Sequence, residues 1–158
     1  MTIKLVEPRP VNPDLIQAGD CMGEIRVDVT LVNVIDEGIA RRGGMADSDI
    51  RRCVVSALVD TGAVRCCIPV HIAERLGVGM TGRTLATYAD GRQEIVDVTE
   101  PIRVEIAGRS TVQYALILGD EVLIGQLVLE DTDLWADCQR RRLVPNPAHP
   151  DQPVFPVK

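Results

Sequence analysis

The stretch Ala57-Leu58-Val59-Asp60-Thr61-Gly62-Ala63 places one carboxylate at the end of an apolar run and immediately before a glycine. The apolar run, Val54–Val59, is long enough for a buried strand. We expect Gly62 to adopt backbone angles closed to other residues, and the Thr61 hydroxyl to lock the loop by hydrogen bonding. The pattern therefore predicts a rigid, partly desolvated Asp60 at the end of a strand.

A second apolar element, Val122-Leu123-Ile124-Gly125, follows much later in the chain. The order apolar-apolar-Asp-Thr-Gly-Ala and then apolar-apolar-Gly resembles the retroviral-like (retropepsin) aspartic protease family, in a bacterial-type single-domain form, over residues 25–145. In that family the second element is a strand that crosses behind the catalytic loop and leads into a short helix. The resemblance implies Asp60 as the catalytic residue, Thr61, Gly62 and Ala63 as the active-site loop, and Leu123, Ile124 and Gly125 as structural support of that loop.

Two positions depart from the family pattern. The family often has an acidic or polar residue soon after Gly-Ala, where this chain has Val64-Arg65. Viral members follow the late glycine with arginine, where this chain has Gln126. These differences leave the dimer contacts and the shape of the substrate pockets open.

The stretch Arg83–Val98 predicts a β-hairpin folded about Tyr88-Ala89-Asp90-Gly91. Asp-Gly is a strong signal for a two-residue hairpin turn. In the family this position holds the flap, a mobile hairpin that closes over a bound peptide. The resemblance thus implies Tyr88, Ala89, Asp90 and Gly91 as flap and substrate-binding residues. Judged from the residues alone, a surface turn without a role is an equal alternative.

The stretch Pro69–Gly77 predicts a short helix, because proline suits the first helical position and glycine suits a left-handed stop. Alternating apolar residues in 102–106 and 112–118 predict a second hairpin across Ala107–Ser110, and a change of parity at Asn33 predicts a bend in a long strand from Ile25. The fold class that follows is all-β, mainly β with one or two short helices. With the resemblance, it is a retropepsin-like closed β-barrel that forms half of a site and carries a flap hairpin.

The length suits one domain, and the prolines gather at the two ends of the chain. We therefore expect an extended N-terminal arm over residues 1–24, a retropepsin-like aspartic protease domain over residues 25–145, and a Pro-rich C-terminal tail over residues 146–158.

The net charge of −6 disfavours nucleic acid as a partner, because phosphate binding needs a basic stripe. Arg140-Arg141-Arg142 is the one basic cluster, and we interpret it as a solvated turn between two short strands, Leu134–Ala136 and Leu143–Val144. No apolar stretch has membrane-spanning length, and the N-terminus lacks the order of a secretory signal. We expect no membrane association and a cytoplasmic location.

The cysteines form no C-x-x-C pair and are odd in number, so reduced thiols are the default. Adjacent Cys66 and Cys67 invite a redox hypothesis, but packing is the favoured interpretation. His71 and His149 lie far apart, which disfavours both a metal site and a Cys/His nucleophile, and we interpret both as bystanders. We predict no metal and no cofactor. The five cysteines are Cys21, Cys53, Cys66, Cys67 and Cys138.

Peptide hydrolysis by two carboxylates needs one to activate water and one to protonate the carbonyl oxygen, yet the chain has a single Asp-Thr-Gly. We therefore predict a symmetric homodimer in which one Asp60 acts as base and the other as acid. The predicted activity is that of an aspartic endopeptidase, a hydrolase whose substrate is an extended polypeptide.

Three alternatives stay open. The acidic stretch Glu130-Asp131-Thr132-Asp133 offers carboxylates for a monomeric site, although a solvated turn or helix start explains it better. A noncatalytic dimeric peptide- or protein-binding module on the same fold is the runner-up. It is disfavoured because a retired enzyme has no reason to keep the buried Asp60 carboxyl. A generic β-barrel with an accidental Asp-Thr-Gly leaves the order of the elements unexplained.

Overall fold

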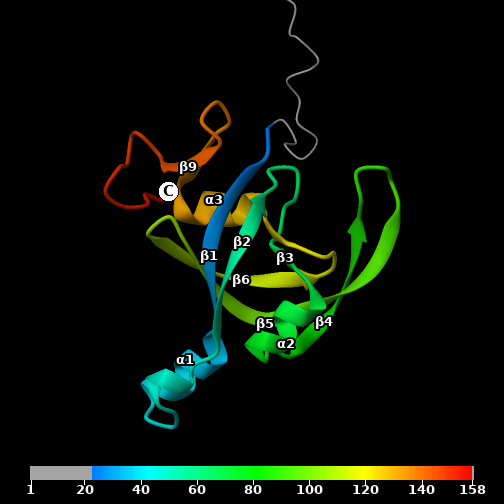
Figure 1. Cartoon of the computed structure of the whole chain (residues 1–158), viewed down its shortest axis with the longest axis vertical. Helices are drawn as coiled ribbons and strands as arrows, with labels where there is room; N and C mark the ends of the chain where they lie inside the picture. The colour runs from blue at the N-terminus through cyan, green and yellow to red at the C-terminus, as the bar shows by residue number, and fades with distance from the viewer. Residues whose placement is uncertain (1–22, 158) are drawn as a thin grey trace, which may run out of the picture.

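The computed structural model of the protein describes residues 23–157. The predicted N-terminal arm, residues 1–24, lies outside the described residues apart from its last two, and so does Cys21. The described chain folds around a closed β-barrel, with short helices packed around it and one hairpin standing beside it (Figure 1). This architecture confirms the prediction of an all-β closed barrel that carries a projecting hairpin.

Six strands form the barrel, with the bounds β1 (Ile25–Asn33), β2 (Arg52–Val59), β3 (Cys67–Ile68), β5 (Gln93–Ile106), β6 (Arg109–Ile117) and β7 (Val122–Ile124). Neighbouring strands pair in the order β1-β2-β7-β3-β6-β5, and a pairing of β1 with β5 closes the ring. The β2–β7 and β3–β6 pairs are parallel. Because β7 runs beside β2 in the same direction, the chain leaves both strands at the same end of the barrel.

β4 (Met80–Thr87) lies at the end of the sheet order and pairs with the first half of β5, which makes the projecting hairpin. β5 is 14 residues long, and its register against β6 shifts between Val98 and Pro101. Pro101 has no N–H to give to the ladder, so the strand changes course there from hairpin to barrel. The two predicted hairpins therefore share one continuous strand.

The second hairpin turns more tightly than the predicted four-residue connection. Ile106 pairs directly with Arg109, which leaves a two-residue turn of Ala107 (φ 48°) and Gly108 (φ 76°). Two successive positive φ values match the twist of the flanking strands and define the commonest two-residue hairpin turn.

Within residues 23–157 three short α-helices and one 3-10 turn connect the strands, where we predicted one or two helices. They are α1 (Val34–Arg41), α2 (Val70–Leu76), α3 (Gln126–Thr132) and the 3-10 turn Asp47–Asp49. α2 is the predicted short helix, and it ends at Gly77 with φ 60°.

The helix that we did not predict is α1, and it takes the place of the expected bend in a long strand. Asn33 is buried; its side-chain oxygen accepts from the backbone N–H of Asp36 at 3.1 Å, and its amide donates to the carbonyl of Leu76 at 2.8 Å. Asn33 therefore ends β1 and caps α1 at once. The change of apolar parity at this point marks a strand-to-helix transition.

A partly buried ion pair holds α1 to Arg51, the residue that precedes β2. The Asp36 side chain is 2% exposed and accepts two hydrogen bonds of 2.7 Å from the Arg51 guanidinium and one of 3.0 Å from the Arg51 backbone N–H. Hydrogen bonding from the guanidinium lowers the pKa of Asp36. This pair lies at the end of the barrel where β2 begins, away from Asp60.

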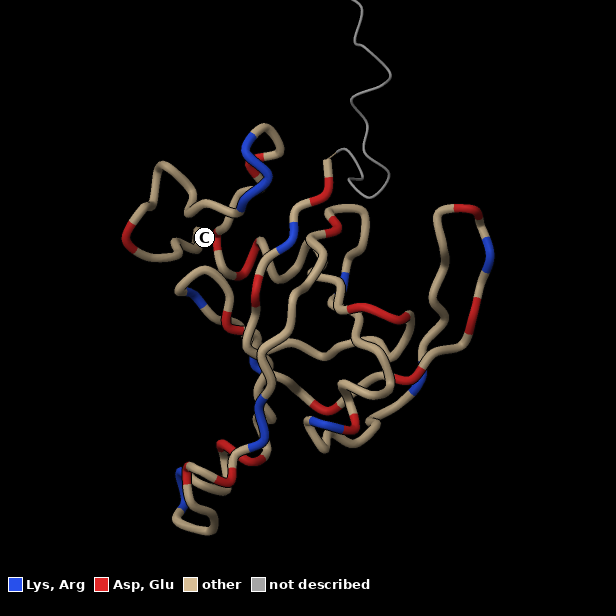
Figure 2. Tube along the Cα trace, viewed as in Figure 1, with Lys and Arg blue, Asp and Glu red and all other residues tan. Residues whose placement is uncertain are grey.

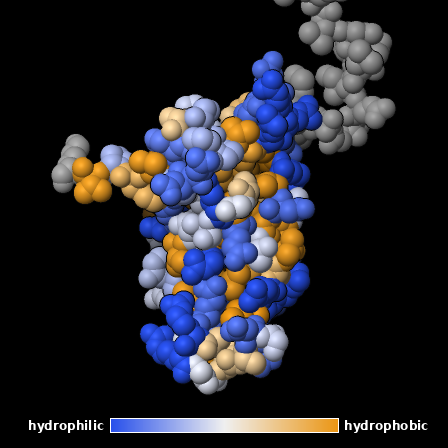
Figure 3. Space-filling view, turned by 90° about the vertical axis from the view of Figure 1, so that its left-hand side faces the viewer, coloured by the Kyte–Doolittle hydropathy of each residue, from blue (hydrophilic) through white to orange (hydrophobic). Residues whose placement is uncertain are grey.

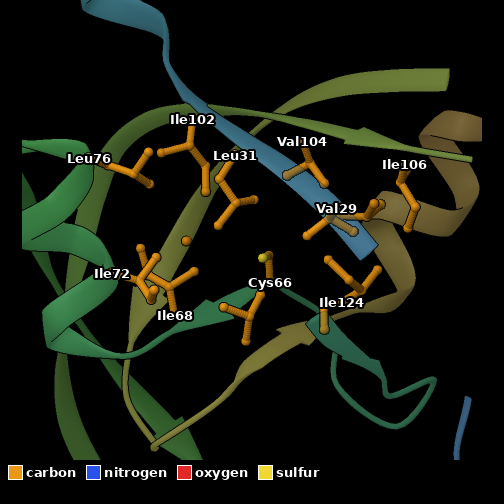
Figure 4. Close-up of a cluster of buried hydrophobic side chains, with 14 of the residues drawn as sticks. Val29, Leu31, Cys66, Ile68, Ile72, Leu76, Ile102, Val104, Ile106 and Ile124 are labelled. Carbon is orange, nitrogen blue, oxygen red and sulfur yellow. The ribbon is translucent and has the colours of Figure 1, made fainter. Parts of the chain in front are cut away.

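Side chains from opposite walls of the barrel meet in one apolar core (Figure 4). Leu31, Ile68, Leu76, Ile102 and Ile124 are completely buried. These aliphatic side chains suit closely packed strands, and they compensate for the scarcity of aromatic residues. Since Ile124 lies at the end of β7, the core extends directly to the strand ends that present the candidate site.

A second, two-stranded sheet follows α3, as predicted, and consists of β8 (Leu134–Asp137) and β9 (Arg142–Pro145). Two of the three arginines at its turn lie near the Asp137 carboxylate, Arg140 at 3.4 Å and Arg142 at 3.5 Å. These ion pairs give the basic cluster a structural role in the turn.

The Pro-rich tail is anchored to the barrel through Asp133. The Asp133 carboxylate accepts from Asn146 Nδ2 at 2.9 Å and from the Val154 backbone N–H at 3.3 Å, and it lies 2.7 Å from His149 Nδ1. The Asn146 hydrogen bond is the largest cause of the lowered pKa of Asp133. His149, which we interpreted as a bystander with respect to metal binding and nucleophilic catalysis, thus has a structural role in this anchor. Beyond the anchor the end of the chain projects from the surface, where Val157 is 93% exposed (Figure 3).

Charged residues of both signs alternate along the described chain, including the projecting hairpin (Figure 2). A membrane-crossing helix, which would have to be long and apolar, does not occur among residues 23–157.

Candidate active site

Asp60 stands at the end of β2, between two neighbouring strands. β2 pairs with β1 on one side and with β7 on the other. The backbone N–H of Asp60 donates to the carbonyl of Ile124, the last residue of β7, at 3.0 Å. The backbone of this residue is thereby fixed to the barrel wall, and its side chain is half-buried.

The turn after Asp60 fixes one oxygen of its carboxylate. The Gly62 backbone N–H donates to Asp60 Oδ1 at 2.9 Å, and the Ala63 backbone N–H donates to the Asp60 carbonyl at 3.2 Å. A Cβ at Gly62 would lie 3.2 Å from Oδ1, and Gly62 does not have a positive φ. The glycine therefore provides room for the carboxylate, whereas we expected it to provide unusual backbone angles.

Thr61 differs from its predicted role. Within residues 23–157 its hydroxyl makes no hydrogen bond, and the residue is exposed. It borders an open cavity of about 450 Å³ between the loop, α3 and the start of β8. The backbone N–H groups of Gly62 and Ala63 hold the loop in place. The Thr61 hydroxyl is therefore available to a second molecule.

Close packing against the loop explains why the Val122-Leu123-Ile124-Gly125 element ends in glycine. A Cβ at this position would lie 2.5 Å from the carbonyl oxygen of Arg65 and 2.8 Å from that of Val64. These are backbone atoms of the loop, so no side-chain rotation relieves the clash. Only glycine lets the loop backbone pack this closely against the end of β7.

The first residues of α3 complete the support of the loop. The backbone N–H of Gln126 donates to the Ala63 carbonyl at 2.8 Å, and that of Leu127 donates to the Val64 carbonyl at 3.0 Å. Helix starts carry N–H groups without intrahelical partners, and loop carbonyls satisfy two of them here. Leu123 pairs with both Leu58 and Cys67, so β7 connects the two chain segments that flank the loop.

Cys66 and Cys67 follow the loop and are both buried. Burial raises the pKa of Cys66 to about 12, and burial followed by the Asp60 charge raises the pKa of Cys67 to about 11. Thiols are nucleophilic and oxidisable as thiolates, so both side chains are poorly suited to redox chemistry near neutral pH. The geometry fits the packing interpretation.

The tip of the β4–β5 hairpin contains the predicted Tyr88-Ala89-Asp90-Gly91 stretch. The Gly91 N–H donates to the Tyr88 carbonyl at 2.9 Å, and the Tyr88 N–H donates to the Arg92 carbonyl at 2.8 Å. With Gly91 at φ 84°, this is a three-residue loop closed by a left-handed glycine, in place of the predicted two-residue turn. Ala89 at the tip is exposed.

Side chains at the tip form a local network. The Tyr88 hydroxyl donates to Glu94 Oε2 at 2.7 Å, and the Arg92 guanidinium lies 5.0 Å from the centre of the Tyr88 ring. Arg92 also binds Asp90 through Nε at 2.6 Å and through its backbone N–H at 3.0 Å. The backbone N–H of Arg92 is the largest cause of the lowered pKa of Asp90.

The hairpin and the loop after β2 project on the same side of the barrel (Figure 1). The fold thus places the hairpin tip and the loop that carries Asp60 on one side of the barrel.

The acidic stretch Glu130–Asp133 is the end of α3, whereas we expected a solvated turn or a helix start. Asp131 accepts from Thr111 at 2.9 Å and also from Gln113. Asp133 follows the helix in a left-handed conformation and anchors the tail. Both carboxylates are thus engaged in structural hydrogen bonds that the local sequence did not indicate.

Metal binding finds no support in the part of the chain that the structure describes. Residues 23–157 contain no group of three His, Cys, Asp or Glu side chains that could hold an ion.

The protein shows weak structural similarity to solved proteins. No protein-family model and no curated protein matches the sequence. The fold is similar to the foamy viral protease-reverse transcriptase in complex with an RNA/DNA hybrid, with 14% identity and a TM-score of 0.43 over 66% of this chain and 11% of that chain. It is similar also to the Simian Foamy Virus (mac) protease in solution, with 16% identity and a TM-score of 0.42 over 66% of this chain and 90% of that chain. Both TM-scores lie below 0.5, a level at which likeness carries no inference of function.

Proposed function

We propose that the protein is an aspartic endopeptidase of the retropepsin type. The proposal is carried by the way in which the fold holds Asp60. Its backbone is hydrogen-bonded to β7, and its Oδ1 accepts from the Gly62 N–H at 2.9 Å. Among the described residues none donates a hydrogen bond to the second carboxylate oxygen, which can therefore act on a water molecule or a substrate. A group that takes and gives a proton needs this combination of fixed orientation and open access.

A second Asp60, from another copy of the chain, completes the proposed site. The sequence has a single Asp-Thr-Gly, and two-fold symmetry brings identical loops together at the axis. Two carboxylates about 3 Å apart share one proton, so one activates water and the other protonates the carbonyl oxygen. The exposed Thr61 and the adjoining cavity, bordered also by Leu129 and the 55% exposed Trp135, form the proposed contact surface.

An extended polypeptide is the proposed substrate. β4 is the last strand in the sheet order, so its outer edge has no strand partner within residues 23–157. Its free backbone groups can pair with an extended peptide that passes between the hairpin and Asp60. Hydrolysis then adds water across the peptide bond, with a carboxylate as one product and an amine as the other.

Cleavage of an unfolded protein between about pH 4 and pH 7 tests this function. Asp60→Asn removes the proton-transfer group and is expected to abolish cleavage. Asp28→Asn, at an exposed residue of β1, is the matched control and is expected to retain it. Equal cleavage by the wild type and Asp60→Asn would remove Asp60 from the mechanism. Dimerisation and peptide binding without any cleavage would favour the noncatalytic binding module.

A further inference from the structure

The two faces of the β4–β5 hairpin differ in burial. Strand register pairs Ala86 with Glu94 and places Val96 on the same face, while Leu85 pairs with Ile95 on the other. Val96 is 4% exposed, whereas Leu85 and Ile95 are 55% and 66% exposed. The face that carries Glu94 is therefore turned toward the barrel, and the Leu85–Ile95 face is turned toward solvent.

Tyr88 positions Glu94 on this inner face. Its hydroxyl donates to Glu94 Oε2 at 2.7 Å, which fixes the position of the carboxylate. Because Glu94 lies on the same strand face as the buried Val96, and the hairpin and the Asp60 loop project on the same side of the barrel (Figure 1), the Glu94 carboxylate lies on the barrel side of the hairpin.

The charge of Glu94 is not balanced within the described chain. Arg92, its nearest basic neighbour in sequence, is engaged with the Asp90 carboxylate at 2.6 Å and with the Tyr88 ring. Among residues 23–157 no Lys or Arg side chain forms an ion pair with Glu94, and Tyr88 occupies only one of its two oxygens. Glu94 thus presents a held carboxylate with unused acceptor capacity.

We propose that Glu94, positioned by Tyr88, binds a Lys or Arg side chain of the substrate polypeptide. A strand that binds beside the hairpin directs every second side chain toward its inner face. Ala86, which is half-buried and pairs with Glu94, can contact the alkyl stem of a basic side chain while its charged end reaches the carboxylate. An apolar side chain at that position would desolvate Glu94 without compensation. Glu94 therefore selects polypeptides with one basic residue close to the cleaved bond.

This selection rests on the proposed peptidase function, and a binding measurement separates the two. Labelled ten-residue peptides carrying Lys, Gln or Glu at each position in turn are titrated against the Asp60→Asn protein, which cannot turn them over. We expect one position at which Lys binds about tenfold more tightly than Gln. Adding Glu94→Gln should remove that preference, and adding Glu94→Lys should shift it to Glu. Glu105→Gln, at an exposed glutamate of the same strand, should leave it unchanged.

Absence of any position that prefers Lys would overturn the assignment, as would a preference that survives Glu94→Gln in a protein with unchanged thermal unfolding. Peptide cleavage by the wild type is measured in parallel. If cleavage depends on Asp60 but does not change with Glu94→Gln, the assignment of Glu94 is contradicted and the peptidase function stands. Glu94-dependent binding without cleavage would contradict the peptidase function and leave the binding assignment intact.

Discussion

The loop that carries Asp60 and the tip of the β4–β5 hairpin are held in place by different kinds of contact. The loop is fixed by distant segments, since Asp60 bonds to Ile124 and the loop carbonyls bond to the start of α3. The tip is fixed by neighbours, since its hydrogen-bond network runs from Tyr88 to Glu94 and includes no other segment of residues 23–157. Long-range contacts tie the loop to global stability, whereas local contacts let the tip move as a unit. The fold thus separates a carboxylate held by distant segments from a hairpin tip held by its neighbours in sequence.

The largest expected effect comes from Gly125→Ala. Its Cβ would meet loop backbone at 2.5 Å, so we expect the free energy of unfolding to fall by about 3 kcal/mol. Gly82→Ala in β4 is the matched control, because a Cβ there meets nothing within 4 Å. Urea unfolding of both variants checks the difference. Equal losses would contradict the account of the loop as a closely packed element.

Asp36→Asn and Asp90→Asn compare an ion pair near the barrel with one at the hairpin tip, by the pH dependence of the free energy of unfolding. The folded-state pKa of Asp36 is lowered, so its stabilisation is complete above the unfolded-state pKa of about 3.9 and is lost as pH falls through the folded-state value. We expect Asp36→Asn to cost about 2 kcal/mol near neutral pH, a figure reduced because Arg51 is half exposed, and the gap to the wild type to close toward about pH 2.

Asp90→Asn is the counterpart of Asp36→Asn at the hairpin tip. The pKa of Asp90 is lowered too, but its contacts lie within an exposed turn. Its urea midpoint should follow that of the wild type at every pH. A pH-dependent loss as large as that of Asp36→Asn would show that the tip contributes to global stability.

Tyr88→Phe removes the hydroxyl that holds Glu94 and leaves the strands intact. We expect an unchanged urea midpoint and a fall in kcat/KM of about fivefold on a substrate with a basic residue. Steady-state kinetics and urea unfolding of the same variant would show whether kcat/KM falls while stability is unchanged. A loss of stability with unchanged kinetics would assign the network a structural role only.

We expect the smallest effect from alkylation of Cys66 and Cys67, the two thiols that follow the loop. With a pKa of about 11, Cys67 is about one thousandth thiolate at pH 8, and Cys66 is lower still. Iodoacetamide should therefore label the exposed Cys138 long before Cys66 or Cys67, as peptide mapping would show. Labelling of Cys67 as fast as Cys138 would mean that the segment behind the loop opens readily.

The parts of the fold that depend on local patterns were predictable from the sequence. The alternation of β-branched residues, the left-handed stop at Gly77 and the turn at Gly91 each follow from neighbouring residues. Turn length was predicted less well, because it depends on the register of the paired strands. The loop and its support were implied by the family resemblance that the order of the two apolar elements carries.

The parts that depend on distant contacts escaped sequence analysis. α1 was missed because the capping residue Asn33 is fixed by the carbonyl of Leu76, far along the chain. The anchor of His149 on Asp133 was missed for the same reason. The reasons for Gly62 and Gly125 also became visible only in three dimensions, since both glycines make room for atoms and neither has a positive φ.

Subunit mixing tests the central claim, a site built from two Asp60 residues, most directly. Wild-type protein is equilibrated with about a ninefold excess of Asp60→Asn, and cleavage is measured per wild-type chain. If each site needs an Asp60 from both subunits, random exchange leaves about one tenth of the wild-type chains with a wild-type partner, so activity per chain falls about tenfold. Activity per wild-type chain that stays constant, with exchange verified by mass, would show that one chain carries a complete site and would contradict the shared dyad.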